Sequence, residues 1–154
     1  MWDALSGVEL KVLNGHTDRI LSVAFSSDGT HIISGSFDQS VQVWDALSGV
    51  QLKVLNSHTG GVGPVAFSSD GTHIVRGSFD QSVQVWDALS GVELELFNGH
   101  TDGVYSVAFS SDGTHIVSGS FDQSVSTLQS PDFSGNGITY LSQWDCNALV
   151  GLNP

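Results

Sequence analysis

Positively charged residues are scarce in this 154-residue chain. Only Lys11, Arg19, Lys53 and Arg76 stand against 16 acidic residues, which gives a formal net charge of −12. Proteins that bind nucleic acid gather Lys and Arg to neutralise phosphate. Four scattered cations form no such patch, and the acidic field of the chain repels phosphate and anionic lipid. We therefore expect no nucleic acid and no membrane as partners, and we expect proteins that are basic or weakly charged.

Cysteine and long apolar runs are also nearly absent. Cys146 is the single cysteine, so an internal disulfide is excluded and a reducing, cytoplasmic compartment is expected. No apolar stretch approaches the roughly 18 residues that a membrane span requires, and the first residues resemble no secretory signal. The chain has no Gly-rich loop followed by Lys-Ser/Thr. We expect no cofactor and no metal.

The sequence instead contains an internal repeat. Trp2-Asp3 recurs as Trp44-Asp45 and Trp86-Asp87, so the period is 42 residues, and segments 2–43, 44–85 and 86–127 align without a gap. Within each unit, short apolar alternations are separated by turn signals such as Asp28-Gly29, a pattern typical of strands joined by hairpins. No helical periodicity is visible over this part of the chain. The repeat predicts an all-β array of short antiparallel strands.

This pattern resembles the WD-repeat (WD40) β-propeller family. The units share HT…VAFSSDGTHI…GSFDQSV, with His upstream and Trp-Asp at the end of a period in the low forties. The resemblance covers about residues 1–127. The chain is also similar to the near-identical WD-repeat arrays of NACHT/STAND-type signalling proteins. The resemblance implies four-stranded antiparallel blades in an incomplete or open propeller. We place the blades within 1–128: an outer strand at 8–13, then blades at 20–55, 62–97 and 104–128, followed by a divergent tail at 129–154.

The resemblance also implies one buried side-chain relay per blade, which links His, Ser, Asp and Trp. In the first unit the matching residues are His16, Ser34, Asp38 and Trp44. Such a chain satisfies every buried polar group and stiffens the blade. The same three residue types form hydrolase triads, but an enzyme has no use for one copy per blade. We therefore interpret the relay as structural and expect no catalytic residue.

The relay is altered in the later units. Arg76 replaces the serine among His58, Asp80 and Trp86, and arginine cannot accept a hydrogen bond. It either pairs with Asp80 or turns outward and leaves His58 short of a partner. In the third unit, His100, Ser118 and Asp122 remain, but Leu128 replaces the tryptophan. We expect blades two and three to be less stable than blade one.

The positions that differ most between units flank the first strand of each blade. Ile20, Val62 and Val104 stay apolar and are expected to face the core, whereas their neighbours vary. The resemblance places these neighbours, and the phenylalanine before the turn aspartate, on a face that commonly binds partners. The candidate partner-binding residues are Arg19, Leu21, Phe37, Phe79, Tyr105 and Phe121. Packing of each phenylalanine against its own blade is the competing interpretation, and His31, His73 and His115 are expected to be solvated turn residues.

Three blades are too few to close a propeller, which usually has about four to eight. Exposed strand edges favour association, so two chains could exchange strands and form a six-bladed homo-oligomer. Alternatively, the chain is a piece of a longer array. In the tail, Ile138, Tyr140 and Trp144 are expected to lie along one strand, without forming a fourth blade.

The sequence thus predicts a non-catalytic scaffold or sensor module that presents a propeller face to a protein partner. The alternative is an oligomeric propeller that binds a small repeated ligand such as a glycan, with phenylalanines stacking on sugar faces. This step rests on likeness of fold.

Overall fold

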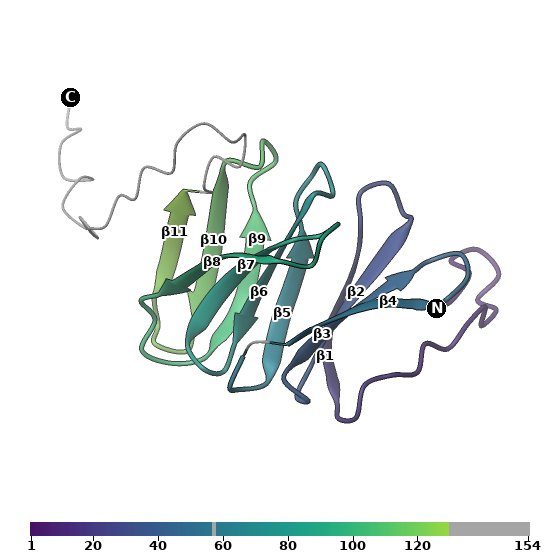
Figure 1. Cartoon of the computed structure of the whole chain (residues 1–154), viewed down its shortest axis with the longest axis horizontal. Helices are drawn as coiled ribbons and strands as arrows, with labels where there is room; N and C mark the ends of the chain where they lie inside the picture. The colour runs from purple at the N-terminus through teal and green to yellow at the C-terminus, as the bar shows by residue number, and fades with distance from the viewer. Residues whose placement is uncertain (57, 130–154) are drawn as a thin grey trace.

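In the computed structural model, which describes residues 1–56 and 58–129, every element is a β-strand (Figure 1). The strands form three antiparallel sheets, two of four strands and one of three, so the expected open array of propeller blades is confirmed. Blade one contains β1 (Ile20–Phe25), β2 (His31–Ser36), β3 (Ser40–Asp45) and β4 (Gln51–Asn56). Blade two contains β5 (Val62–Phe67), β6 (His73–Ser78), β7 (Ser82–Asp87) and β8 (Glu93–Asn98). Blade three contains β9 (Val104–Phe109), β10 (His115–Ser120) and β11 (Val125–Gln129).

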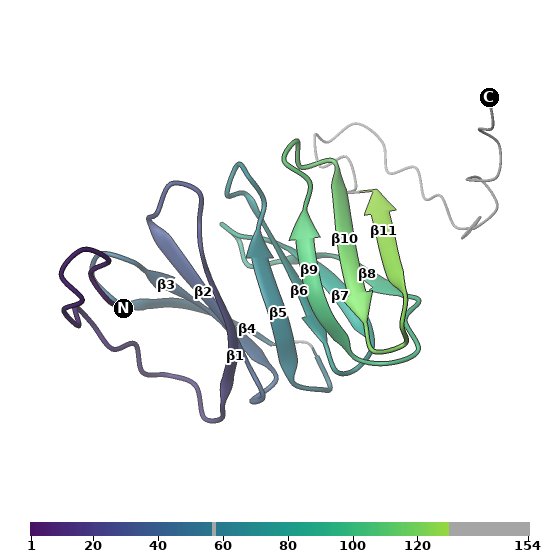
Figure 2. The same cartoon turned by 180° about the vertical axis from the view of Figure 1, so that it is seen from behind.

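The blades stand side by side like the leaves of a fan (Figures 1 and 2). Within each blade the strands pair in chain order, and the pairing registers repeat from blade to blade: Ile32 faces Trp44, Ile74 faces Trp86 and Ile116 faces Leu128. The first strands lie together on the inner side of the fan, with β1 beside β5 and β5 beside β9. Pro64 lies on β5, within this inner row.

The hydrophobic core lies between consecutive blades. One cluster joins Ile33, Val41 and Leu55 of blade one to Val62 and Trp86 of blade two. A second cluster joins blade two to blade three in the same way. Alternating apolar residues on a strand occupy one face of its sheet, so each blade presents an apolar face to its neighbour. Among residues 1–56 and 58–129, the stack therefore ends in two such faces, one on blade one and one on blade three.

Two expectations about the first unit need correction. Residues 8–13 form no regular strand; Trp2 and Glu9 make an isolated bridge. Leu13 and Met1 nevertheless pack against Trp44. Ile20 does not face the core: it is 50 % exposed, whereas Val62 and Val104 are 0 % exposed. These valines pack on the preceding blade, whereas no blade formed by the described residues packs on Ile20.

Candidate partner-binding face

Blade one contains the complete relay of hydrogen bonds. The Trp44 indole N–H donates to Ser34 Oγ at 2.9 Å, and Ser34 Oγ lies 2.7 Å from His16 Nε2. His16 Nδ1 lies 2.8 Å from Asp38 Oδ2. Because an indole can only donate, the serine hydroxyl is free to donate to His16 Nε2, which leaves the Nδ1–H for the carboxylate. The relay therefore ties the loop before β1 to β2, to β3 and to the turn between them.

The carboxylate of Asp38, in the turn between β2 and β3, accepts further hydrogen bonds. Burial alone would raise the pKa of Asp38, but hydrogen bonds from the Ser40 hydroxyl, the Thr17 N–H and His16 together lower it to about 2. Ser40 Oγ donates to Asp38 Oδ1 at 2.6 Å, and the Thr17 N–H donates to Oδ2 at 3.0 Å. A carboxylate that accepts several hydrogen bonds stays ionised and holds its donors in place. Asp38 therefore fixes the position of the β2–β3 turn.

Blade three retains all of this relay except its tryptophan. His100 lies 2.8 Å from Asp122 and 2.9 Å from Ser118, and Leu128 occupies the tryptophan position, where it is 9 % exposed. The Ser124 hydroxyl donates to Asp122, whose pKa is lowered chiefly by this bond. The turn is thus held in blade three as it is in blade one.

Blade two departs from both expected arrangements. Arg76 does not turn outward, since it is 0 % exposed. Its guanidinium donates to Gln84 Oε1 and to the Leu55 carbonyl of blade one, and it lies 4.4 Å from the centre of the Trp86 ring. Asp80 stays with His58 at 2.8 Å and acts on Arg76 through its charge. His58 Nε2 is nevertheless buried without a hydrogen bond, although Arg76 points inward.

This arrangement makes blade two sensitive to acid. Burial and, secondarily, the Arg76 charge lower the pKa of His58 to about 4, from an ordinary value of 6.5. A lowered pKa means that the unfolded chain binds a proton more readily, so stability present above pH 6.5 is lost as the pH falls toward 4. We expect the free energy of unfolding to drop by about 1 kcal/mol from this group between pH 7 and pH 5.5. Urea titrations at several pH values measure this slope.

The matched control for that prediction is the Arg76→Ser variant, which removes the nearby charge and offers His58 a hydroxyl. Its stability is expected to fall less over the same pH range. Equal slopes in the two proteins would show that Arg76 does not lower the pKa of His58.

A row of aromatic side chains crosses the three blades at the same turns. The Phe37 and Phe79 rings stack, with centroids 5.1 Å apart and an interplanar angle of 14°. Tyr105 lies edge-on to Phe79 at 4.9 Å and 3.8 Å from Phe121. The Arg19 guanidinium lies 4.7 Å from the centre of the Phe37 ring and extends the row beyond it. We call these five residues the aromatic row.

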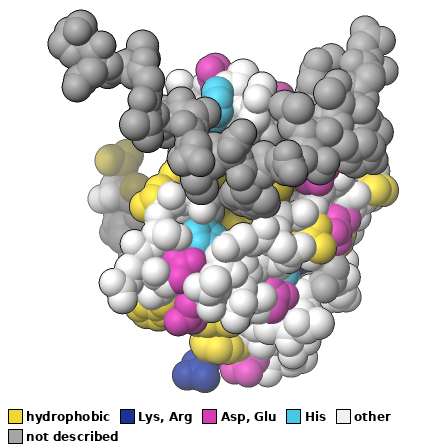
Figure 3. Space-filling view, turned by 90° about the vertical axis from the view of Figure 1, so that its left-hand side faces the viewer, with side chains coloured by type: hydrophobic (Ala, Val, Ile, Leu, Met, Phe, Trp, Pro, Cys, Tyr) yellow, Lys and Arg dark blue, Asp and Glu magenta, His cyan; other side chains and the backbone are white. Residues whose placement is uncertain are grey.

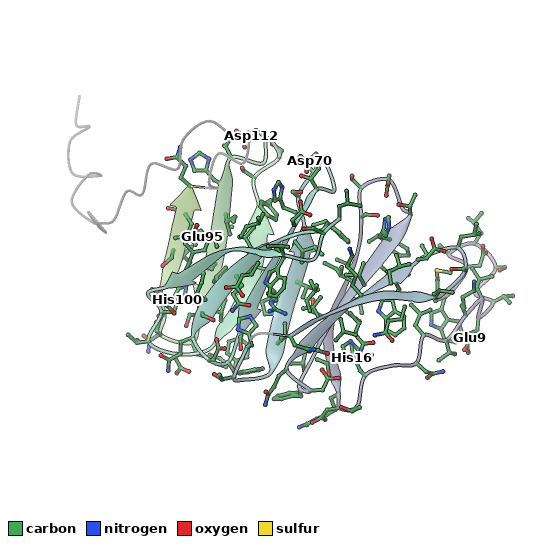
Figure 4. The ribbon with its side chains drawn as sticks, in the orientation of Figure 1. Glu9, His16, Asp70, Glu95, His100 and Asp112 are labelled. Atoms are coloured by element: carbon green, nitrogen blue, oxygen red, sulfur yellow. The ribbon has the colours of Figure 1, made fainter. Side chains whose placement is uncertain are left out.

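Backbone hydrogen bonds hold the row's phenylalanines beside the relay. The Phe37 N–H donates to the Arg19 carbonyl at 2.9 Å, and Phe79 and Phe121 make the equivalent bonds to Gly61 and Gly103. Each phenylalanine also directly precedes a relay aspartate. Figure 4 shows His16 and His100 along one edge of the fan, whereas Asp70 and Asp112 lie at turns on the opposite edge. The relay therefore positions the turns that carry the row.

Two glycines make room for the stacked rings. A Cβ on Gly61 would lie 2.8 Å from the Phe37 ring, and one on Gly103 would lie 3.2 Å from the Phe79 ring. Arg19 occupies the equivalent position in blade one, where no earlier phenylalanine needs that space. Rings from neighbouring blades can therefore meet only because the residue between them has no side chain.

The comparisons with known proteins agree with this geometry. The family described as "WD domain, G-beta repeat" matches residues 7–45, 49–87 and 91–126, which is most of the chain. The chain belongs to the WD40 repeat family. It is 42 % identical over 43 residues to a guanine nucleotide-binding protein subunit beta of Schizosaccharomyces pombe, and 40 % identical over 43 residues to a subunit beta-5b of Danio rerio. Each match covers 28 % of this chain but only 14 % and 11 % of the relatives.

The candidate partner-binding residues of this WD40 chain differ in how far they are exposed. Leu21 is 41 % exposed at the blade-one position that Tyr105 occupies in blade three. Tyr105 and Phe121 are 44 % and 62 % exposed, whereas Phe37 and Phe79 are half-buried. The phenylalanines therefore pack across blades, which neither sequence interpretation described. The exposed part of the row lies at its blade-three end.

Sequence reasoning missed two WD40 relay members. Ser40 and its equivalents Ser82 and Ser124 donate to the turn carboxylates, as do the backbone N–H groups of Thr17, Thr59 and Thr101. The detectable signal was the Asp-X-Ser spacing, which all three units share.

The turn histidines take part in local hydrogen bonds. His31, His73 and His115 each place Nδ1 within 2.7 Å of the preceding threonine hydroxyl. Within residues 1–56 and 58–129, no group of three or more His, Cys, Asp or Glu side chains could hold a metal ion. The same residues include no helix long and apolar enough to cross a membrane.

Proposed function

We propose that this chain is a non-catalytic protein-interaction module that binds its partner along the aromatic row. The observation that carries the proposal is the continuity of the row, which runs from Arg19 to Phe121 across all three blades. Interfaces concentrate their binding energy in a few aromatic and arginine side chains. WD40 repeats and the similarity to G-protein beta subunits support a protein-interaction role in general.

The charge of the chain supports a basic or weakly charged protein partner rather than nucleic acid. The net charge is −12, and the exposed Asp18 and Asp102 lie directly before Arg19 and Gly103, beside the row. Figure 3, which views the blade-three end, shows acidic side chains spread over that face. We propose an extended segment with an aliphatic or aromatic anchor and a nearby Lys or Arg. A cytoplasmic location is proposed on the single cysteine alone.

Burial of the relay supports the absence of catalysis. The His16 side chain is 3 % exposed and Ser34 is 3 % exposed. The serine hydroxyl already accepts the Trp44 N–H. A nucleophile must reach its substrate, and this one is enclosed by the blade.

The glycan alternative has less support. A sugar stacks on an open aromatic face, but Arg19 and Phe79 lie against the Phe37 ring, and Phe37 and Tyr105 lie against Phe79. A second copy of this chain is also proposed as a partner, because the fan ends in two apolar faces.

Peptide selection tests the proposed binding face. Peptides selected on the immobilised chain from a random library are expected to carry an apolar anchor and a basic residue. Their affinity should fall at least about tenfold for the Tyr105→Ala, Phe121→Ala double variant, the loss typical of one hot-spot residue. The matched control is Leu89→Ala, which truncates a side chain that is 87 % exposed and outside the row. Titration calorimetry measures each affinity.

Two outcomes would contradict this proposal. Selected peptides that bind the double variant as tightly as the wild type would place the binding face elsewhere. A glycan array that returns specific sugars, whose binding is lost on Phe37→Ala, would favour the alternative function.

A further inference from the structure

The first strand of each blade carries apolar side chains at equivalent positions, and these are buried or half-buried in blades two and three but exposed in blade one. In blade two, Val62 is 0 % exposed and Val65 is 7 % exposed, because both pack on blade one. In blade one, the equivalent Ile20 and Val23 are 50 % and 66 % exposed, and Phe25 is 56 % exposed. We call Ile20, Val23 and Phe25 the leading face. It has the composition of a buried blade face and lies in solvent.

Blade three, at the opposite end of the fan, exposes apolar side chains whose equivalents in blade one are buried. Ile33 and Val41 of blade one are 0 % exposed beneath blade two. Their equivalents in blade three, Val117 and Val125, are 38 % and 73 % exposed. Phe121 is also exposed there. We call Val117, Gly119, Phe121 and Val125 the trailing face.

A glycine on each blade leaves room for a side chain of the next blade, and we call this position the glycine seat. A Cβ on Gly35 would lie 3.1 Å from Val62 Cγ1, and one on Gly77 would lie 2.5 Å from Val104 Cγ1. Both internal interfaces thus place a β-branched side chain directly over a glycine. Gly119 is the same seat on blade three, and among residues 1–56 and 58–129 the nearest atom to a Cβ there is Ser106 Cβ at 3.7 Å. No side chain of the described residues therefore fills the seat of blade three.

We propose that the leading face of one copy docks on the trailing face of a second copy, with Ile20 seated over Gly119. This inference rests on the proposed self-association and specifies its two surfaces. The template is the chain itself, which makes the same contact twice between its own blades. The contact needs no exchange of residues 8–13, because Leu13 packs on blade one at the place that Leu55 takes on blade two, and the described part of blade three has no outer strand there. Met1 packs where Val43 does in the internal interface, so residues 1–3 must move aside for residues 127–129 of the second copy.

One residue and the overall charge oppose this contact. Arg19 stands where both internal interfaces have glycine, at Gly61 and Gly103, so it meets the second copy's Phe121 with a side chain that those positions lack. Two copies of net charge −12 also repel each other. We therefore expect a modest affinity that tightens in the Arg19→Gly variant and at higher salt, which screens the repulsion.

Complementation between two variants tests the proposed surfaces. Ile20→Asp places a charge on the leading face, and Gly119→Val fills the seat on the trailing face, where the strand has space for a side chain. Each variant alone is expected to associate at least about tenfold more weakly than the wild type. An equimolar mixture keeps one intact face of each kind and is expected to form a dimer that grows no further. Sedimentation velocity distinguishes these species.

Controls make the possible results distinct. Leu89→Asp, on blade two and away from both faces, should associate like the wild type, and circular dichroism should show that all variants are folded. A wild type that stays monomeric at every concentration tested would overturn the self-association and this docking mode together. Association of Ile20→Asp or Gly119→Val at wild-type strength, or a mixture without dimer, would overturn the docking mode alone. Phe121 belongs to both the trailing face and the aromatic row, but none of these three variants changes a residue of the row, so peptide binding can be measured on them separately.

Discussion

Replacing Gly77 with alanine is expected to lower the free energy of unfolding by about 3 kcal/mol, the upper range for overpacking a tight core. The added Cβ would lie 2.5 Å from Val104 Cγ1 and 3.0 Å from Val104 Cβ. Both groups belong to the buried interface between blades two and three. Val104 is β-branched, stiff at χ1 and 0 % exposed, and a change of χ1 would not move its Cβ, so its side chain cannot relieve the contact by rotation alone. The blades must therefore move apart, and urea titration measures the loss.

The same substitution at Gly119 is the matched control. Within the described part of the chain, its Cβ would meet only Ser106, at an ordinary contact distance of 3.7 Å. An alanine in a strand also loses less conformational entropy on folding than a glycine, so Gly119→Ala is expected to be neutral or stabilising by about 0.5 kcal/mol. Val104→Ala combined with Gly77→Ala should recover part of the loss, as a double-mutant cycle of contacting residues does. If Gly77→Ala and Gly119→Ala were equally stable, the glycine seat would have no role in blade packing.

The blade could be predicted from the sequence because its determinants are local and repeated. His16, Ser34, Asp38 and Trp44 lie within one unit, and the family pattern places them together. Strand pairing follows in the same way, since each hairpin joins neighbouring segments. The role of Ser40 could be predicted in the same way, because the turn fixes its spacing from Asp38.

Features that depend on two blades were not predictable in this way. The stacking of Phe37 on Phe79 needs Gly61 between them, so three residues from two units decide it. Ile20 looks like a core residue by its side chain, but its exposure depends on a neighbouring blade. A pattern within one unit cannot report what packs against that unit.

Arg76 is the strongest example of this limit. The sequence shows only that a serine has become an arginine, which suggests an ion pair or an exposed side chain. The structure stabilises it with Gln84 from the next strand and with the Leu55 carbonyl from the preceding blade. Neither acceptor belongs to the relay motif, so the motif could not identify them.

Restoring the serine is expected to stabilise the chain. The Arg76→Ser variant should raise the free energy of unfolding by about 2 kcal/mol, because it supplies the buried His58 Nε2 with a hydroxyl donor and removes a desolvated charge beside it. Burial lowers the pKa of Arg76 itself to about 10, a direct sign of that desolvation. The Trp86 N–H, now 3.4 Å from Gln84 Oε1, would gain a better acceptor, as Trp44 has in Ser34. Thermal unfolding measures the gain.

Two further variants separate the causes of this gain. Arg76→Ala removes the charge without supplying a hydroxyl, so it should be less stable than Arg76→Ser by about 1 kcal/mol, the net contribution of one hydrogen bond. Ser34→Arg imposes the change on blade one and should destabilise the chain, since it removes the partner of His16 Nε2. A loss of stability in Arg76→Ser would instead mean that the arginine's packing on Trp86 and its bond to Leu55 outweigh the broken relay. Arg76 would then be a clamp between blades one and two, and the altered relay would be a stabilising feature of this array.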